Sequence, residues 1–391
     1  MSAVPRGDAV ALTRELVRID SRNPSLVPGA PGEREAARAL AEVLRAWGFR
    51  VEVHDAAPGR PNVIARAGRA GGRTLMLNGH LDVVGTDGMR HPPFDAAERE
   101  GRLYGRGASD MKSGVAAMCA AAARAADAGL DGEIVIAAVA DEEWESAGTR
   151  ALLERGVRAD AAIVTEPTRL TIMPAHRGFA WLTVTVHGRA AHGSRYDIGV
   201  DAIRHAGLLL AELDALQERA LAGRAHPLLG PPSLHASTIE GGIGMSTYPD
   251  RCVLRVERRT IPGERASDAL DELRAACDRV RARRASFRAD VTLDVAQGPS
   301  DVSTDAPIVR ALARALEGVG EAVRIEGMSA WTDAALLNEA GIPAICFGPG
   351  DIGLAHAAEE WVEAGEIRRA ADALERLARE WTSQGGTAWL S

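Results

Sequence analysis

The sequence is poor in lysine, in cysteine and in long apolar runs. Lys112 is the single lysine among 46 basic residues, which suggests that its site requires a lysine. The four cysteines are scattered and form no C-x-x-C pair, so we expect reduced thiols and a cytoplasmic protein. No run of about 18 apolar residues is present to span a membrane, and the first ten residues lack the core of a signal peptide. We therefore expect no membrane partner.

Concentrated positive charge and several hydrolase signatures are missing as well. The formal net charge is -8, and the arginine-rich run at 279–288 is explained better by a solvated helix end than by a nucleic-acid surface. The sequence contains no G-x-S-x-G elbow and no H-E-x-x-H motif. These absences argue against nucleic-acid binding, a serine hydrolase and the H-E-x-x-H type of zinc protease.

The length and the order of apolar patterns predict two domains, one inserted in the other. A chain of 391 residues with 46% apolar residues is too long for one core. Alternating strands and helices predict an α/β layered domain with its chemistry at the carboxyl ends of strands. Its expected helices are 8–20, 31–47, 115–128, 307–316, 332–339 and 362–381, and its expected strands are 49–53, 62–66, 74–77, 133–140, 161–165, 322–325 and 343–347.

The middle of the chain has a different pattern. Strands expected at 179–187, 233–239, 251–257 and 289–295, with helices at 199–221 and 264–284, give the order βαββαβ of a ferredoxin-like unit. We therefore predict an inserted domain at 178–297 and a catalytic domain formed by 1–177 and 298–391.

A histidine and two carboxylates between positions 80 and 110 form the first candidate site. His80 and Asp82 follow the strand at 74–77 with one residue between them, so both side chains point to one side of an extended backbone. The imidazole would bind a metal while the acid holds its other ring nitrogen. Asp110 lies between Gly107 and Gly114, in a loop that opens a helix. A hydrogen-bonded strand histidine and a helix-capping aspartate explain this stretch equally well.

Further acidic residues follow other strands. Glu142, Glu143 and Glu166, like His80, lie one to three residues beyond the last apolar residue of an expected strand. Three strand ends that each present a metal-ligand type of residue are difficult to explain as a solvated surface.

Five motifs resemble the metal-site motifs of the M20 family: NGHLDVV, GRGASDMKSG, DEE, TEPT and GLAHAAEE. They occur in the family's order over essentially the whole chain. M20 proteins are co-catalytic zinc amidohydrolases and exopeptidases. The resemblance implies a zinc-exopeptidase-like layered catalytic domain with an inserted ferredoxin-like (βαββαβ) lid domain, which the family uses for dimer contacts.

The resemblance also implies the metal ligands. Asp110 would bridge two ions, His80 and Glu166 would complete one, and Glu143 and His356 the other. Mixed nitrogen and oxygen ligands suit zinc, and cobalt or manganese would fit the same set. Two further catalytic roles follow, for Glu142 as the general base and for Asp82 as the residue that orients His80.

Other site residues are implied in the lid domain and near the end of the chain. His192 would stabilise the oxyanion in the active site of a partner subunit, and Arg259 would bind a substrate carboxylate, with Arg258 as the alternative. Ser246 stands where many relatives carry Asn. Gly350 belongs to a glycine-lined turn that either faces the substrate or is an ordinary turn.

The implied function is hydrolysis of the amide bond in a small N-acyl amino acid by a homodimer, as in the acetylornithine deacetylase and succinyl-diaminopimelate desuccinylase branch. A metallo-carboxypeptidase or dipeptidase acting on short peptides is the alternative. A metal-binding homologue without turnover is the third hypothesis.

Overall fold

The computed structural model describes residues 4–69 and 71–383, and its contacts divide the chain into two units. The first unit comprises Met1–Pro174, Val302–Glu326 and Thr332–Ser391, and the second comprises Ala175–Asp301 and Gly327–Trp331. The predicted boundaries, at 177/178 and 297/298, lie within four residues of these. Gly327–Trp331 joins the second unit because Arg177 N donates to Met328 O and the Trp331 indole donates to Gly298 O, over 3.2 and 3.0 Å.

A central sheet organises the first unit. Its strand order is β1 (Arg50–Ala57), β2 (Arg60–Gly68), β6 (Glu133–Val139), β3 (Thr74–His80), β7 (Ala161–Val164), β15 (Ala344–Cys346) and β8 (Ile172–His176). The four strands from β6 to β15 are parallel and almost fully buried, as their continuous apolar runs predict. Their carboxyl ends therefore meet at one edge of the sheet.

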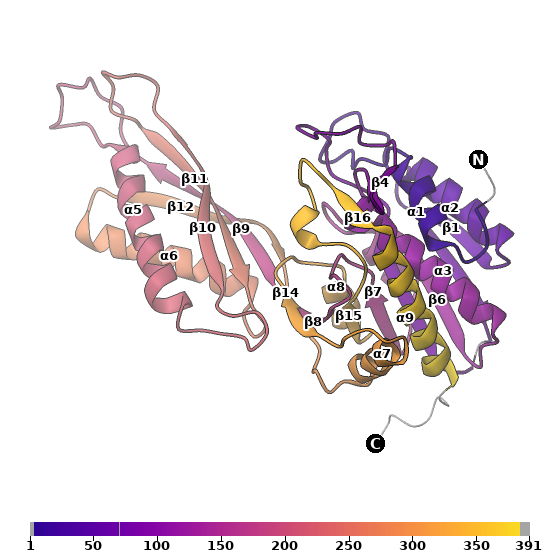
Figure 1. Cartoon of the computed structure of the whole chain (residues 1–391). Helices are drawn as coiled ribbons and strands as arrows, with labels where there is room; N and C mark the ends of the chain where they lie inside the picture. The colour runs from indigo at the N-terminus through magenta and orange to yellow at the C-terminus, as the bar shows by residue number, and fades with distance from the viewer. Residues whose placement is uncertain (1–3, 70, 384–391) are drawn as a thin grey trace. The chain divides into compact units, whose positions relative to one another are not determined.

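Helices cover the central sheet and pack against one another (Figure 1). α3 (Ser113–Asp127) is buried over most of its circumference and packs against α1 (Ala9–Val17) and α9 (Ala364–Ser383). α2 (Arg34–Ala46) and α7 (Pro307–Gly318) contribute apolar side chains to the same core. α4 (Ala147–Glu154) and α8 (Ala334–Glu339) contact each other. The α/β layered architecture is thus confirmed.

The second unit is a four-stranded antiparallel sheet with two helices on one face (Figure 1). The order along the chain is β9 (Gly178–His187), α5 (Ala202–Leu216), β10 (Ser233–Gly241), β11 (Arg251–Thr260), α6 (Ala266–Arg283) and β12 (Arg288–Gln297). This is the βαββαβ order that the sequence predicts.

Several predicted elements need correction. The strand expected at 322–325 forms at β14 (Ile325–Met328), and the helix expected from residue 362 begins at Ala364. Trp361–Glu363 is instead strand β16, which pairs with β5 (Arg102–Tyr104) and, through it, with β4 (Ala97–Arg99). Strands of three residues are too short to show an alternating pattern, so the sequence gives no sign of this sheet. The helix expected at 199–221 is α5, continued by a π-helical segment at Gln217–Leu221.

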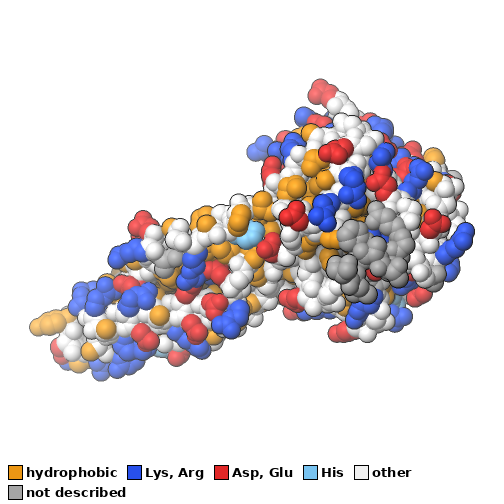
Figure 2. All heavy atoms as spheres, turned by 90° about the horizontal axis from the view of Figure 1, so that it is seen from below, with side chains coloured by type: hydrophobic (Ala, Val, Ile, Leu, Met, Phe, Trp, Pro, Cys, Tyr) orange, Lys and Arg blue, Asp and Glu red, His pale blue; other side chains and the backbone are white. Residues whose placement is uncertain are grey.

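The described surface carries charges of both signs. Figure 2 shows basic and acidic side chains interspersed on the face that is drawn. In residues 4–69 and 71–383, no helix combines the length and apolarity needed to cross a bilayer. The four cysteines are buried and unpaired.

Gly114 allows α3 to approach the end of β7, and its replacement should destabilise the first unit. A methyl group at Gly114 would lie 1.9 Å from the main-chain oxygen of Thr165. We expect Gly114→Ala to lower the free energy of unfolding by about 1–3 kcal/mol, the usual cost of overpacking. Urea unfolding measures this change.

Gly207→Ala is the matched control in α5, because a methyl group there meets nothing within 4 Å. This variant should be neutral or stabilising by up to about 1 kcal/mol, since alanine favours a helix. Equal unfolding midpoints for Gly114→Ala and the wild type would contradict the packing argument.

Candidate metal centre

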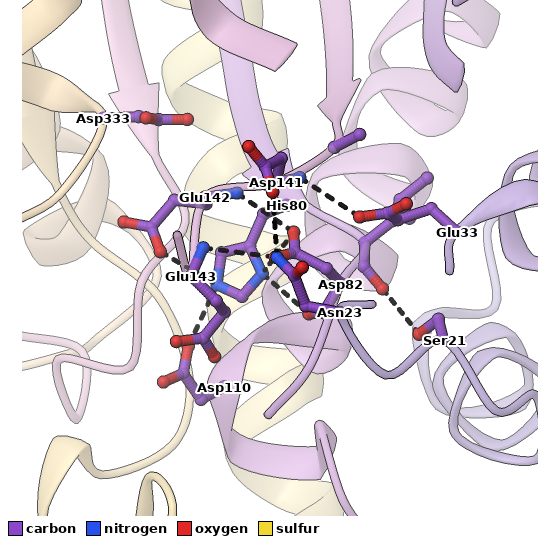
Figure 3. Close-up of polar contacts among 12 residues, drawn as sticks. Ser21, Asn23, Glu33, His80, Asp82, Asp110, Asp141, Glu142, Glu143 and Asp333 are labelled. Carbon is purple, nitrogen blue, oxygen red and sulfur yellow. Dashed lines mark hydrogen bonds and ion pairs between the residues drawn. The ribbon is translucent and has the colours of Figure 1, made fainter. Parts of the chain in front are cut away.

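His80 ends β3 with both ring nitrogens engaged (Figure 3). Nδ1 lies 2.9 Å from the main-chain oxygen of Asp82 and 3.6 Å from its carboxylate, while Nε2 lies 3.2 Å from Asp110 Oδ1. The sequence predicts that the Asp82 carboxylate holds the ring. The hydrogen bond goes to the Asp82 carbonyl instead, so Nε2, which faces Asp110, is the ring nitrogen that can bind a metal.

The Asp82 carboxylate binds the backbone of the neighbouring acidic turn. Oδ1 accepts the Glu142 N–H at 3.2 Å, and Oδ2 accepts the Glu143 N–H at 3.1 Å. Asn23 Nδ2 donates to Oδ2 at 2.8 Å. Asp82 therefore fixes both the histidine and the two glutamates that follow β6.

The five predicted ligands come together as two overlapping groups. His80, Asp110 and Glu166 form one, Asp110, Glu143 and His356 form the other, and the ligand atoms of each group lie within 4.8 Å of one another. Asp110 Oδ1 faces His80, while Asp110 Oδ2 lies 3.6 Å from His356 Nε2. The two oxygens of one carboxylate thus face different histidines, as a residue bridging two ions requires.

The adjacent glutamates point to different groups. Glu143 Oε2 lies 3.0 Å from His356 Nε2, whereas Glu142 Oε2 lies 4.0 Å from His80 Nε2. Glu142 is not needed to complete either group. Its carboxylate is therefore available to exchange a proton beside the site.

The charge of the cluster fits bound cations. Burial raises the pKa of Glu142 well above its usual value; the His80 charge opposes this rise and Glu166 adds to it. Burial and the Asp110 charge raise the pKa of Glu166 in the same way. Asp333, above Glu142 in Figure 3, has its pKa raised to about 6 by burial. Divalent cations would offset this crowding of carboxylates, and imidazole and carboxylate donors suit zinc.

Comparison with known proteins agrees with this arrangement. The profile of the family described as "Peptidase family M20/M25/M40" matches residues 76–380. The chain belongs to this family. It is thus an M20 hydrolase of amide or peptide bonds, with a residue cluster suited to metal binding.

The relatives include deacylases. An acetylornithine deacetylase from Myxococcus xanthus is 35% identical over 345 residues, covering 85% of this chain and 88% of its own. A succinyl-diaminopimelate desuccinylase from Paracoccus denitrificans (strain Pd 1222) is 32% identical, covering 96% and 98%.

Solved structures share the fold. The aminopeptidase PepT from Bacillus cereus has a TM-score of 0.79 at 20% identity, covering 97% of this chain and all of its own. The M20 metallo-carboxypeptidase Sso-CP2 from Sulfolobus solfataricus has a TM-score of 0.80 at 17% identity, covering 96% and 99%.

Glu360 supports Asp110 in this M20 centre, a role that the sequence did not reveal. It is fully buried, and its Oε1 accepts the N–H groups of Ser109 at 2.9 Å and Asp110 at 3.1 Å. Its Oε2 pairs with Arg106 at 2.7 Å. The second glutamate of the GLAHAAEE motif thus holds the bridging loop in place; its position in that motif was the available signal.

Lys112 and Gly350 also support this loop. Lys112 is fully buried, donates from Nζ to Ile19 O at 2.8 Å, and has its pKa lowered to about 7 by burial. Gly350 has φ +89°, and a methyl group there would lie 2.6 Å from Ser109 Oγ. Close packing on the loop accounts for this glycine without a substrate contact.

His192 and Ser246 lie in neighbouring exposed loops of the second unit. Gly193 N donates to Ser246 O at 2.7 Å, and His192 Nδ1 lies 2.9 Å from Ser194 Oγ. Both side chains are thus accessible to a ligand or a second chain.

The two candidate arginines of the second unit differ in availability. Arg258 is fully buried and pairs with Glu264 at 2.8 Å and Glu272 at 3.0 Å. The Arg259 side chain is 32% exposed and pairs with Glu257 at 2.9 Å. Of the two, Arg259 is the one whose guanidinium group is accessible to a ligand.

Asn23 joins the centre to a buried ion-pair network (Figure 3). Its amide donates to Asp82 and, at 3.0 Å, to Asp141, which has φ +67° directly before Glu142. Arg60 lies 3.1 Å from Asp141 and pairs with the buried Glu33. Asn23 thus ties the orienting aspartate to the turn that carries both glutamates.

Asn23→Ala should lower kcat about 10- to 100-fold, the usual effect of losing a group that supports a metal ligand, while the protein stays folded. Steady-state kinetics and circular dichroism measure the two effects. Asn338→Ala is the control, because the Asn338 amide bonds Ala334 and Ala344 away from this turn. Asn338→Ala should lower stability without a comparable loss of kcat, and equal kcat losses in both variants would contradict a specific role for Asn23.

Proposed function

We propose that this M20 hydrolase removes the acyl group from small N-acyl amino acids, using two divalent ions, with zinc as the expected metal and cobalt or manganese as possible substitutes. The observation that carries the proposal is the position of Asp110 between His80 and His356. The deacetylase and desuccinylase names of the relatives support the substrate class. His80, Asp110 and Glu166 would hold one ion, and Asp110, Glu143 and His356 the other.

Glu142 is the proposed general base. The ions, when bound, polarise the scissile carbonyl and make a water molecule more acidic. Glu142 takes the proton of that water as the water attacks the amide carbon. The protonated Glu142 then donates to the departing amine, which completes the proton balance. Its raised pKa suits a group that must both accept and release a proton.

Three residues of the second unit complete the proposal. Arg259 binds the carboxylate of the substrate, because a guanidinium group matches a carboxylate in a bidentate manner. Ser246, with one hydroxyl, adds a weaker polar contact than the Asn of many relatives. His192 stabilises the developing oxyanion in the active site of a second copy of the chain.

A homodimer formed through the second unit follows from this role of His192, and the four unpaired cysteines support a cytoplasmic location. Exposed apolar side chains support the homodimer: Tyr196, Ile243 and Met245 are 83%, 84% and 103% exposed. β10 is an edge strand that another chain can cover.

A carboxypeptidase or dipeptidase would use the same residues on a short peptide. The names of structural matches, including human carnosine dipeptidase 1, agree with this alternative. A panel of N-acetyl, N-succinyl and peptide substrates separates the two reactions.

Glu142→Ala should lower the turnover of N-acetyl amino acids at least about 100-fold, because the water loses its proton acceptor. Metal content, measured by mass spectrometry of the dialysed protein, should stay at the wild-type value. Glu145→Ala, an exposed acid in the same turn, is the control and should keep its activity. Retained turnover in Glu142→Ala would refute the role of the base.

A mixture of two inactive variants tests the role of His192. If His192 acts in the partner's site, a heterodimer of His192→Ala and Glu142→Ala contains one site with both wild-type residues. Co-refolding the two variants should therefore restore activity to about a quarter of the wild-type value, a statistical expectation for C2 dimers. Activity that stays at the level of the separate variants would show that His192 does not act across subunits.

A further inference from the structure

Aromatic side chains are scarce in this chain, yet three of them cluster in the second unit, and one of the three lies beside Arg259. The sequence has five Phe, seven Trp and three Tyr in 391 residues. In the second unit, the ring centroids of Phe179 and Trp181 lie 5.0 Å apart, and those of Phe179 and Trp331 lie 6.4 Å apart. The Arg259 guanidinium carbon lies 5.6 Å from the Phe179 ring centroid. We call Phe179, Trp181 and Trp331 the ring cluster.

The strand register places two of these rings on the open face of the sheet. Ala180, Leu182, Val184 and Val186 of β9 point into the core under the helices, so the alternate residues of β9 point to the other face. Phe179 is paired with Arg259, and Trp181 is paired with Glu257. The two rings, the arginine and the glutamate therefore share the face of the sheet opposite the helices.

The rest of that face along β9 is polar. Thr183, Thr185 and His187 follow Trp181 at alternate positions, and His187 pairs with Asp290 at 2.7 Å. The aromatic side chains of β9 stand at the end where Arg259 lies. Trp181 remains 40% exposed, so no part of its own unit covers it fully.

The charges around Arg259 favour an anion and disfavour a cation. Burial and the neighbouring charges of Arg259 and Arg258 lower the pKa of Arg177. Glu257 is already shared: it accepts the Trp181 indole N–H at 3.1 Å, pairs with Arg259 at 2.9 Å and lies 3.6 Å from His235 Nε2. A cationic side chain would thus meet the Arg259 charge and a carboxylate that is already engaged, while the buried Arg258 is compensated by Glu264 and Glu272.

We propose that the ring cluster packs the side chain of the substrate amino acid and selects N-acyl amino acids with an aromatic side chain. This inference rests on the proposed function, in which Arg259 binds the substrate carboxylate. In an α-amino acid the carboxylate and the side chain leave the same carbon, so a carboxylate on Arg259 brings the side chain near Phe179, whose ring centroid lies 5.6 Å from the guanidinium carbon, and thus near the ring cluster. Aromatic rings favour offset or edge contacts with a further ring.

A purely structural role for the rings predicts a different outcome. Trp331 also donates to Gly298 O at 3.0 Å, so loss of the rings would then impair the unit for all substrates equally. N-acetyl-L-alanine separates the two roles, because it needs Arg259 but has no side chain for the rings to hold.

The test compares kcat/KM for N-acetyl-L-phenylalanine, N-acetyl-L-alanine and N-acetyl-L-ornithine in the zinc-loaded enzyme. We expect the phenylalanine substrate to exceed the other two by at least about tenfold, within the range of a good aromatic contact. Trp181→Ala and Phe179→Leu should remove most of this preference by raising KM for the phenylalanine substrate, with a change below about twofold for alanine. His187→Ala, a ring removed from the far end of the same strand face, should keep the preference.

Equal kcat/KM for the three substrates, a preference for ornithine, or an unchanged preference in Trp181→Ala would overturn the inference while leaving the proposed function intact. If none of the three is hydrolysed, the proposed function fails. Calorimetric binding of L-phenylalanine and L-ornithine to the zinc-loaded protein then decides the inference: tighter binding of phenylalanine that Trp181→Ala removes supports it, and equal binding overturns it.

Discussion

The structure of the site depends on one carboxylate that is shared between two imidazoles. Asp110 is 10% exposed at its side chain and lies within 3.2 and 3.6 Å of His80 and His356. A small shift of its backbone would bring the carboxylate closer to one histidine and farther from the other. Glu360 fixes the loop by accepting two consecutive backbone N–H groups, and the Arg106 charge compensates this buried acid.

The parallel sheet delivers the other groups to the same edge. His80 ends β3, the Glu142–Glu143 pair follows β6, and Glu166 follows β7. These strands are adjacent and parallel, so their ends are one strand spacing apart. Asp82 then connects two of these ends through the backbone of the acidic turn. The arrangement concentrates negative charge, which bound cations would offset.

Much of this was predictable from local pattern. The buried strands EIVIAAVA and TLML and the βαββαβ order of the second unit appear in the sequence, because apolar periodicity reports directly on burial. His80, Glu142, Glu143 and Glu166 could then be identified as candidates, because each of these ligand-type residues follows the end of an expected strand. His356 follows no strand, and only the resemblance of GLAHAAEE to a family motif identified it.

The rest depends on contacts between residues distant in the sequence. Asn23 and Asp82 are 59 positions apart, and Asp110 and Glu360 are 250 apart, so no local pattern announces these bonds. The hydrogen-bond partner of His80 Nδ1 differs from the prediction for a related reason. The Asp82 carboxylate accepts hydrogen bonds from the backbone of the acidic turn, and the Asp82 carbonyl bonds the ring. The three-residue strands β5 and β16 were missed because pairing, not sequence, defines them.

Anomalous diffraction from crystals of the zinc-loaded protein tests the central claim most directly. The account predicts two peaks about 3.5–4 Å apart, one beside His80 and Glu166, the other beside Glu143 and His356, with Asp110 within coordination distance of both. A single peak, or a pair of peaks of which one is not bound by Asp110, would contradict it.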